Sequence, residues 1–299
     1  MENKVYSQVY SILKTSKEGV LDAIKGLAEI GFDGIEAMGT NTGGLSKADF
    51  HKFINDLGIR IISFHSLRDD EDRAFAQEFG AQFTDVRPLD HLVTVDDCKR
   101  SAEQMTQMCE HLREFGLTGI VHNHASEFRR TADDPEHTLY DLLLKFTDPA
   151  LVKFELDVGW AARAGVNTGD LIRAHSGRFP VLHVKECNAV ATCDDDLDHF
   201  PKKVMEMMQV AAASADDKKF VKGAPVFSPA QIEILCNSRS WNSELGQGII
   251  DWEDVKNAAE AQPGGCVAYI SEREFFGYYG HEGNPMEFAK RDYAFLRAL

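Results

Sequence analysis

The stretch His183-Val-Lys-Glu186 closes a short, otherwise apolar run with three titratable side chains. A strand that only packs a core stays apolar to its end, whereas parallel α/β barrels keep their sites at the carboxyl ends of their strands. The run therefore predicts that His183 and Lys185 take part in binding or catalysis at a strand end.

Polar side chains end three more predicted strands in the same way. These ends are His122-Asn-His124 followed by Glu127, Glu155-Leu-Asp157, and Glu272-Arg-Glu274. Residues two apart share one face of a strand, so the inward faces of these ends collect both carboxylates and imidazoles. Carboxylates that converge without a cation raise each other's pKa values, whereas a divalent metal makes the cluster favourable. The four strand ends together predict a metal site.

The candidate donors indicate which metal would bind. One imidazole with three carboxylates is an oxygen-rich ligand set, which suits Mn²⁺ or Mg²⁺ and leaves Co²⁺ and Zn²⁺ as alternatives. The six cysteines are scattered without CxxC pairs, so we expect free thiols and no thiolate zinc site. Taken singly, His183 could be an interior histidine and Asp157 could cap the helix that follows it. Their joint occurrence is what favours a metal.

Strand-like runs alternate with amphipathic helical runs along the 299 residues. The predicted strands are 5–13, 33–38, 59–66, 82–88, 119–124, 152–158, 181–185 and 266–272. Predicted helices cover 16–30, 46–57, 95–115 and 251–261, the first three closed by Gly31, Gly58 and Gly116. Eight successive βα units close most naturally as a (β/α)8 TIM barrel. We expect one barrel domain over residues 1–299, with a doubly wound open sheet as the alternative.

Residues from about 187 to 243 interrupt this alternation, because they are too many for an ordinary connection. The segment holds an acidic run at 194–198, a Met-rich stretch at 204–213 that predicts a helix, and a stretch at 218–229 with little sign of order. Since the segment follows the seventh strand, it is either a lid over the site or a surface excursion.

The formal net charge of −16 disfavours a nucleic-acid partner, because such binding depends on Lys and Arg neutralising phosphates. A small sugar or polyol is the expected partner. No apolar run approaches the roughly 18 residues of a membrane span, and no leader precedes the first strand. We therefore expect a cytoplasmic protein without membrane attachment. The sequence is also compatible with a homo-oligomer, since exposed barrel helices often dimerise.

Several motifs occur together in one order. They are His122-Asn-His-Ala-Ser-Glu-Phe128, Leu156-Asp-Val-Gly-Trp-Ala-Ala-Arg-Ala-Gly165, Gly177-Arg178, His183-Val-Lys-Glu186 and Glu244-Leu-Gly-Gln-Gly-Ile-Ile-Asp251. In this order the chain resembles the sugar phosphate isomerase/epimerase family with the xylose-isomerase-like TIM barrel. The resemblance implies a divalent metal held by Glu127, Asp157, His183 and Glu272, with His124 as the alternative to Glu127. The chain departs from the family pattern in its long insertion and in Glu186, where many relatives carry Asp.

The reaction that the resemblance implies removes a proton from a carbon next to a carbonyl, giving an enediolate that a metal stabilises. Glu127 and Glu272 would move the proton, and Lys185 would either hold a substrate oxygen or pair with Glu155. Further residues expected to contact substrate or orient the site are Glu36, His65, His122, His124, Glu155 and Glu244.

This chemistry is that of a sugar isomerase or epimerase, and loss of a β-hydroxyl would instead make the protein a dehydratase. Two rivals come from other classes. One is a non-catalytic barrel that retains its metal, and the other is a DNA-repair endonuclease of the same superfamily. The acidity of the chain opposes the endonuclease.

Overall fold

Eight parallel strands close into a barrel in this computed structural model, which describes residues 4–13, 19–89, 91–213, 220–221, 224–225, 229–274 and 285–299. The barrel strands are β1 Val5–Gln8, β2 Gly34–Met38, β3 Arg60–His65, β4 Phe83–Asp85, β5 Thr118–His122, β6 Lys153–Asp157, β7 Val181–Val184 and β10 Ala268–Ser271. Their order around the barrel is β1-β10-β7-β6-β5-β4-β3-β2. The predicted (β/α)8 barrel is confirmed, and the doubly wound alternative is wrong.

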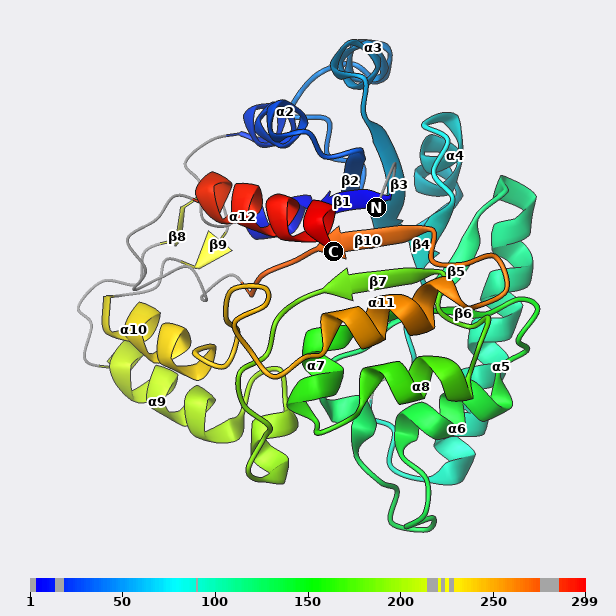
Figure 1. Cartoon of the computed structure of the whole chain (residues 1–299), viewed down its shortest axis with the longest axis vertical. Helices are drawn as coiled ribbons and strands as arrows, with labels where there is room; N and C mark the ends of the chain where they lie inside the picture. Colours follow the sequence, from blue (N-terminus) through cyan, green and yellow to red (C-terminus); the bar gives the residue numbers. More distant parts are fainter. Residues whose placement is uncertain are drawn as a thin grey trace.

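Helices surround the strands (Figure 1). They are α1 Val9–Leu13, α2 Val20–Ile30, α3 Lys47–Leu57, α4 Asp70–Glu78, α5 Val95–Leu112, α6 Leu139–Phe146, α7 Val158–Arg163, α8 Thr168–Ala174, α9 Lys202–Ala213, α10 Pro229–Ser238, α11 Trp252–Glu260 and α12 Pro285–Ala298. The largest apolar cluster includes strand residues such as Phe64 and Leu182 together with helix residues such as Leu27 and Leu143. Burial of these side chains between strands and helices fixes where each strand end lies on the rim.

The first strand is shorter than predicted. It ends at Gln8, and Val9–Leu13 forms the short helix α1. The side-chain oxygen of Gln8 accepts a hydrogen bond from the Tyr10 N–H at 2.8 Å, which starts the turn. Val9 and Ile12, three residues apart, are both buried, as expected of one face of a helix. The prediction of a strand over 5–13 is therefore wrong after residue 8.

The other predicted helices end close to the glycines that marked them. Gly31, Gly58 and Gly116 all adopt positive φ angles, which glycine accepts without strain. Helix α3 begins after Ser46, whose side chain accepts from the Asp49 N–H. The predicted helix 95–115 is α5 followed by a 3-10 turn at Arg113–Phe115. The predicted helix 16–30 begins at Val20, and residues 16–18 lie outside the described residues.

The barrel interior changes character along the strands. A small apolar cluster, with Ile120, Val181 and Ile270 among its members, fills one level of the interior. Two residues further along the same strands come His122, His183 and Glu272. Because alternate residues share one face of a strand, these polar side chains stand directly above the apolar level, at the carboxyl end. The barrel thus presents its titratable groups on an apolar floor.

The insertion after β7 adds two helices beyond the barrel. Helices α9 and α10 lie on the side toward which the arrowheads of β7 and β10 point (Figure 1). They share a small core in which Met208 and Leu235 are buried. Helix α9 confirms the helix predicted at 204–213, whereas most of 218–229 lies outside the described residues apart from a small β8–β9 pair, Phe220–Val221 and Ala224–Pro225.

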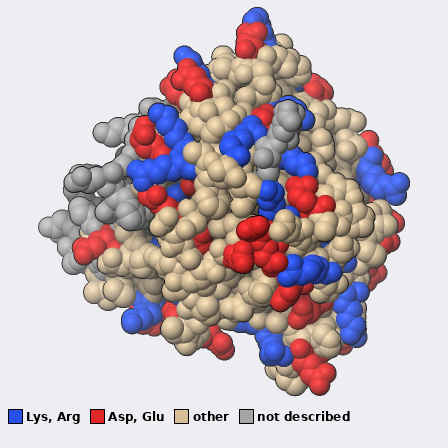
Figure 2. Space-filling model, in the orientation of Figure 1, with Lys and Arg blue, Asp and Glu red and all other residues tan. Residues whose placement is uncertain are grey.

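All six cysteines are free, as predicted. Among the helices that the structure describes, none is both long and apolar enough to span a bilayer. On the face drawn in Figure 2, Lys and Arg are interspersed with Asp and Glu and form no extended basic patch.

Candidate active site

Four potential metal ligands from four neighbouring strands converge at the carboxyl end of the barrel. His122, Asp157, His183 and Glu272 each offer a ligand atom, and these atoms lie within 4.8 Å of one another. The first three end or lie near the end of β5, β6 and β7, and Glu272 follows β10 directly, where its N–H bonds to the Val184 carbonyl at 3.2 Å. We call these four residues the rim group.

A second group lies next to the rim group and shares His183 with it. Glu36, His65, Glu155 and His183 are all buried, with ligand atoms within 4.8 Å of one another. His65 Nε2 lies 3.1 Å from Glu36 and 2.9 Å from Glu155, while His183 Nε2 lies 2.8 Å from Glu36 and 3.2 Å from Glu155. We call these four residues the inner group.

The carboxylates of the inner group control the charge of its histidines. Burial alone would lower the pKa of His183, but the carboxylates of Glu155 and Glu36 outweigh it and raise that pKa well above the usual value. The same balance of burial against these two carboxylates raises the pKa of His65. In the metal-free protein both imidazoles are therefore cationic at neutral pH, and they neutralise the two buried carboxylates.

The rim group fits a divalent metal better than the inner group does. Metal-binding histidines usually donate their second ring N–H to a carboxylate. Nε2 of His183 has this partner in Glu36, while Nδ1 faces Glu272 at 2.6 Å. Asp157 Oδ2 is buried, and its charge is balanced by the Lys185 ammonium 2.9 Å away. A metal among the rim group would use this oxygen and Nδ1, with the inner group orienting His183 from below.

The resulting ligand set differs in composition from the expected one. It contains two imidazoles and two carboxylates, where one imidazole and three carboxylates were expected. Such a mixed nitrogen and oxygen set accommodates Zn²⁺, Co²⁺ or Mn²⁺ more readily than Mg²⁺, which prefers oxygen alone.

Glu127, the residue expected on strand five, lies outside both groups. It sits in a 3-10 turn, Ser126–Phe128, after β5 has ended. Its carboxylate accepts from the His124 N–H at 3.0 Å and from the Ser126 hydroxyl at 2.9 Å, so the side chain folds back onto its own loop. His122 occupies the strand-five position of the rim group, and its Nδ1 lies 3.1 Å from Glu155.

Lys185 is fully buried and bridges three carboxylates. Its Nζ lies 2.9 Å from Asp157, 3.3 Å from Glu272 and 2.8 Å from Glu274. Burial would lower the pKa of this amine, but the three carboxylates raise it, so the side chain stays charged. The alternative pairing with Glu155 does not occur, because Glu155 is engaged by the histidines.

Two further expected residues lie apart from the groups. Glu244 is at the surface, where it pairs with Arg291 of α12. His124 stands beside the rim group, with its ring 5.2 Å from that of His122 and 5.5 Å from that of Trp160. Burial lowers the pKa of His124 well below its usual value, so this imidazole is neutral.

Glu186 fastens the returning end of the insertion. Its carboxylate accepts hydrogen bonds from the N–H groups of Cys187 at 3.0 Å, Gly246 at 2.9 Å and the Trp252 indole at 2.7 Å. This buried residue therefore has a structural role.

Replacing Glu186 with Gln should lower the free energy of unfolding by about 1–3 kcal/mol, because the amide NH₂ leaves a buried N–H without an acceptor. Urea unfolding measures this loss. Glu244→Gln is the matched control, since that surface side chain should cost less than about 0.5 kcal/mol. Equal stability of the two variants would show that Glu186 does not fasten the segment.

Three residues near the rim and inner groups were not predicted from the sequence. Gln8 donates to Glu36 at 2.8 Å, and Arg239 and His199 reach the mouth from the insertion. Gln8 ends β1, so a correct end for that strand would have revealed it. No periodic signal marked the other two.

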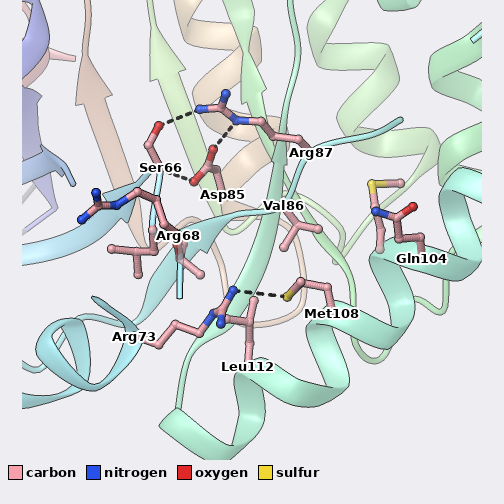
Figure 3. Close-up of a pocket in the computed structure, with 12 residues that line it drawn as sticks. Ser66, Arg68, Arg73, Asp85, Val86, Arg87, Gln104, Met108 and Leu112 are labelled. Carbon is pink, nitrogen blue, oxygen red and sulfur yellow. Dashed lines mark hydrogen bonds and ion pairs between the residues drawn. The ribbon is translucent and has the colours of Figure 1, made fainter. Parts of the chain in front are cut away.

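A cavity of about 350 Å³ lies outside the barrel between the ends of β3 and β4 and helices α4 and α5. Figure 3 shows Arg68, Arg73 and Arg87 among its lining residues. Each arginine is paired with an aspartate, namely Asp72, Asp70 and Asp85 respectively. The cavity shares no residue with the rim or inner group, so it is separate from the candidate site.

No family model matches the chain, and no curated protein matches it. Solved structures do match over nearly the whole length. A sugar phosphate isomerase/epimerase from Parabacteroides distasonis is 21% identical, with a TM-score of 0.68 over 100% of this chain and 95% of that one. The probable 3-DHS dehydratase AsbF from Bacillus anthracis is 14% identical, with a TM-score of 0.67 over 98% of each chain.

A third match is the IolI protein, solved with a bound zinc atom. It is 13% identical, with a TM-score of 0.64 over 99% of this chain and 97% of that one. These identities are low while the coverage is nearly complete, so the matches establish the fold. The chain shares the barrel fold of xylose isomerase-like proteins.

Proposed function

We propose that the protein is a divalent-metal-dependent isomerase or epimerase of a keto-sugar or related polyol, acting by proton abstraction next to a carbonyl. The observation that carries the proposal is the rim group, in which two imidazoles and two carboxylates converge at the carboxyl end of a barrel. Similarity to sugar isomerase and epimerase structures supports the substrate class.

His122, Asp157, His183 and Glu272 would hold the metal. When bound, the metal would polarise the substrate carbonyl and stabilise the negative charge that develops as the neighbouring carbon loses its proton. The zinc bound by the similarly folded IolI protein supports a metal here without specifying which one.

Glu272 is the side chain of the rim group suited to move the proton. It directly follows β10 and lies 3.3 Å from the Lys185 ammonium. Burial would raise the pKa of Glu272, but Lys185 and His183 outweigh it and keep the carboxylate ionised. Glu272 is therefore the base that removes the proton. His122 serves as a ligand, because its Nδ1 lies 3.1 Å from Glu155 and its other ring nitrogen would hold the metal.

Exchange of substrate α-protons with D₂O tests this function. The protein, loaded with Mn²⁺, should catalyse deuterium incorporation into at least one member of a panel of keto-sugars and inososes. A chelator should abolish the exchange and added metal should restore it. Exchange that persists after complete metal removal would contradict the mechanism, and absence of exchange across the panel would favour a non-catalytic barrel.

A dehydratase is the second candidate, and the position of Lys185 favours it. The ammonium lies 3.3 Å from Glu272, so a charged hydrogen-bond donor stands beside the base and would stabilise a departing β-hydroxyl. The dehydratase would release water and form a conjugated carbonyl product, which absorbs in the near ultraviolet. The isomerase would give exchange without that absorbance.

The affinity for the metal should rise with pH. His183 is cationic in the metal-free protein because of its raised pKa, and a metal ligand must lose its proton. Below the raised pKa, Mn²⁺ affinity should increase about tenfold per pH unit for each proton displaced. Calorimetry in two buffers of different ionisation enthalpy measures the protons released. Binding that releases none would show that His183 is not a ligand.

A further inference from the structure

The insertion crosses the mouth of the barrel and is tied to it on two sides. Its two ends are joined where the Asn188 N–H bonds to the Trp241 carbonyl at 2.9 Å. On the far side, Arg129 in the loop after β5 bonds to Asp198 at 2.7 Å and to the Asp194 carbonyl. The insertion therefore spans from the β7 end to the β5 end, over the strands that carry the rim group.

Arg239 reaches from the insertion into the site. Its side chain is 3% exposed, and its Nε donates to Glu274 at 3.1 Å. Glu274 in turn pairs with Lys185, which pairs with Asp157 and Glu272 of the rim group. Glu274 thus lies between two cations, which hold its pKa at about 2 against the opposing effect of burial. One ion-pair chain connects the insertion to the rim group.

The donors of Arg239 are only partly used. Within the described residues, its hydrogen bonds to Glu274 and to the His199 carbonyl use two of the five guanidinium N–H groups. The guanidinium also lies 5.5 Å from the centre of the Trp160 ring, and the Lys185 ammonium lies 5.4 Å from it. A buried guanidinium with N–H groups that no described residue accepts, beside a proton-transfer site, is suited to bind oxygens of a ligand.

His199 is the second insertion residue at the mouth. Its ring lies 4.7 Å from that of His124 and 5.5 Å from that of Trp160. Burial lowers its pKa to about 4, so the ring is neutral. Its Nδ1 is buried and makes no hydrogen bond to any described residue. A buried polar atom without a partner is costly, and a bound hydroxyl group would relieve that cost.

We propose that Arg239 and His199 form the outer wall of the site and bind oxygens of the substrate at the end away from the metal ligands. The inference rests on the proposed function and adds to it that the insertion determines which sugar or polyol is accepted. Arg239 would donate hydrogen bonds to those oxygens, and His199 Nδ1 would form one hydrogen bond with a hydroxyl group.

The test compares Arg239→Ala, Arg239→Lys and His199→Ala with the control Lys203→Ala. Lys203 is an exposed residue of the same insertion. With the sugar that exchanges best in D₂O, the two alanine variants should raise KM about tenfold or more, since hydrogen bonds involving a charged group or a buried polar atom are lost. Their kcat should stay within about threefold, because ground-state and transition-state binding are lost together. The KM of Arg239→Lys should lie between those of the wild type and Arg239→Ala. The KM of Lys203→Ala should equal that of the wild type.

Mn²⁺ affinity, measured on every variant, shows that the rim group is intact. A KM for both alanine variants within about twofold of the wild type would overturn the proposal. Acrylamide quenching of tryptophan emission is the readout that needs no substrate, since Trp160 is buried against both wall residues. Quenching should increase in the alanine variants alone.

The two readouts separate this inference from the proposed function. One outcome is that the wild type exchanges no sugar while quenching increases only in the Arg239 and His199 variants. That outcome would contradict the proposed function but support the placement of Arg239 and His199 in the outer wall. If quenching is the same in all variants, the wall is contradicted whatever the activity.

Discussion

Asp157→Asn should weaken Mn²⁺ binding by at least about 100-fold, because loss of a direct ligand should cost no less than loss of the groups that support ligands. Metal-dependent proton exchange should fall with it. The substitution is close to isosteric and separates two roles of the side chain. Oδ1 caps helix α7 by accepting from the Trp160 N–H at 2.8 Å, and an asparagine oxygen can keep that bond. Oδ2 is the other, buried oxygen, which lies 2.9 Å from the Lys185 ammonium and would bind the metal in its place.

Asp251→Asn is the matched control, because Asp251 caps α11 in the same way but lies outside both groups. It should leave Mn²⁺ affinity unchanged. Comparison of His122→Gln with Glu127→Gln then decides the strand-five ligand, and only the former should weaken binding. An Asp157→Asn protein with wild-type Mn²⁺ affinity would rule out the rim group as the metal site.

Lys185→Met should destabilise the metal-free protein by about 3–5 kcal/mol, since it leaves buried carboxylates without their cation. The three carboxylates are those of Asp157, Glu272 and Glu274. A divalent metal would replace the lost charge at the first two, so Mn²⁺ should restore much of the stability. The stabilisation by saturating Mn²⁺ should therefore be larger in the variant than in the wild type.

Urea unfolding with and without Mn²⁺ measures both effects. Lys47→Met is the control, because its exposed pair with Glu78 should contribute at most about 1 kcal/mol. If metal-free Lys185→Met is as stable as the control, then Lys185 does not neutralise the empty site.

Strand periodicity explains why part of the site could be predicted. Asp157 and His183 end or nearly end their strands, and alternation along a strand fixes which face each occupies. Barrel closure then brings neighbouring strand ends to one rim, and the register pairs Asp157 directly with His183. Chemistry at a strand end is therefore visible in the sequence once the barrel is expected.

The remaining contacts of the site depend on the paths of loops, and loop residues show no periodic pattern in the sequence. The difference between His122 and Glu127 arises because β5 stops at His122 and the following 3-10 turn directs the Glu127 carboxylate to its own backbone. Glu244 pairs with Arg291, a residue 47 positions away. Arg239 reaches Glu274 because the insertion folds back over the mouth. Each of these contacts requires the path of an irregular segment in space.

Anomalous diffraction at the manganese edge, from crystals grown with Mn²⁺, would locate the metal among its candidate ligands. We expect one anomalous peak within coordination distance of His122, Asp157, His183 and Glu272, with Lys185 displaced from Asp157, Glu272 or both. A peak beside Glu127, a peak within the inner group alone, or no peak at saturating Mn²⁺ would contradict this expectation.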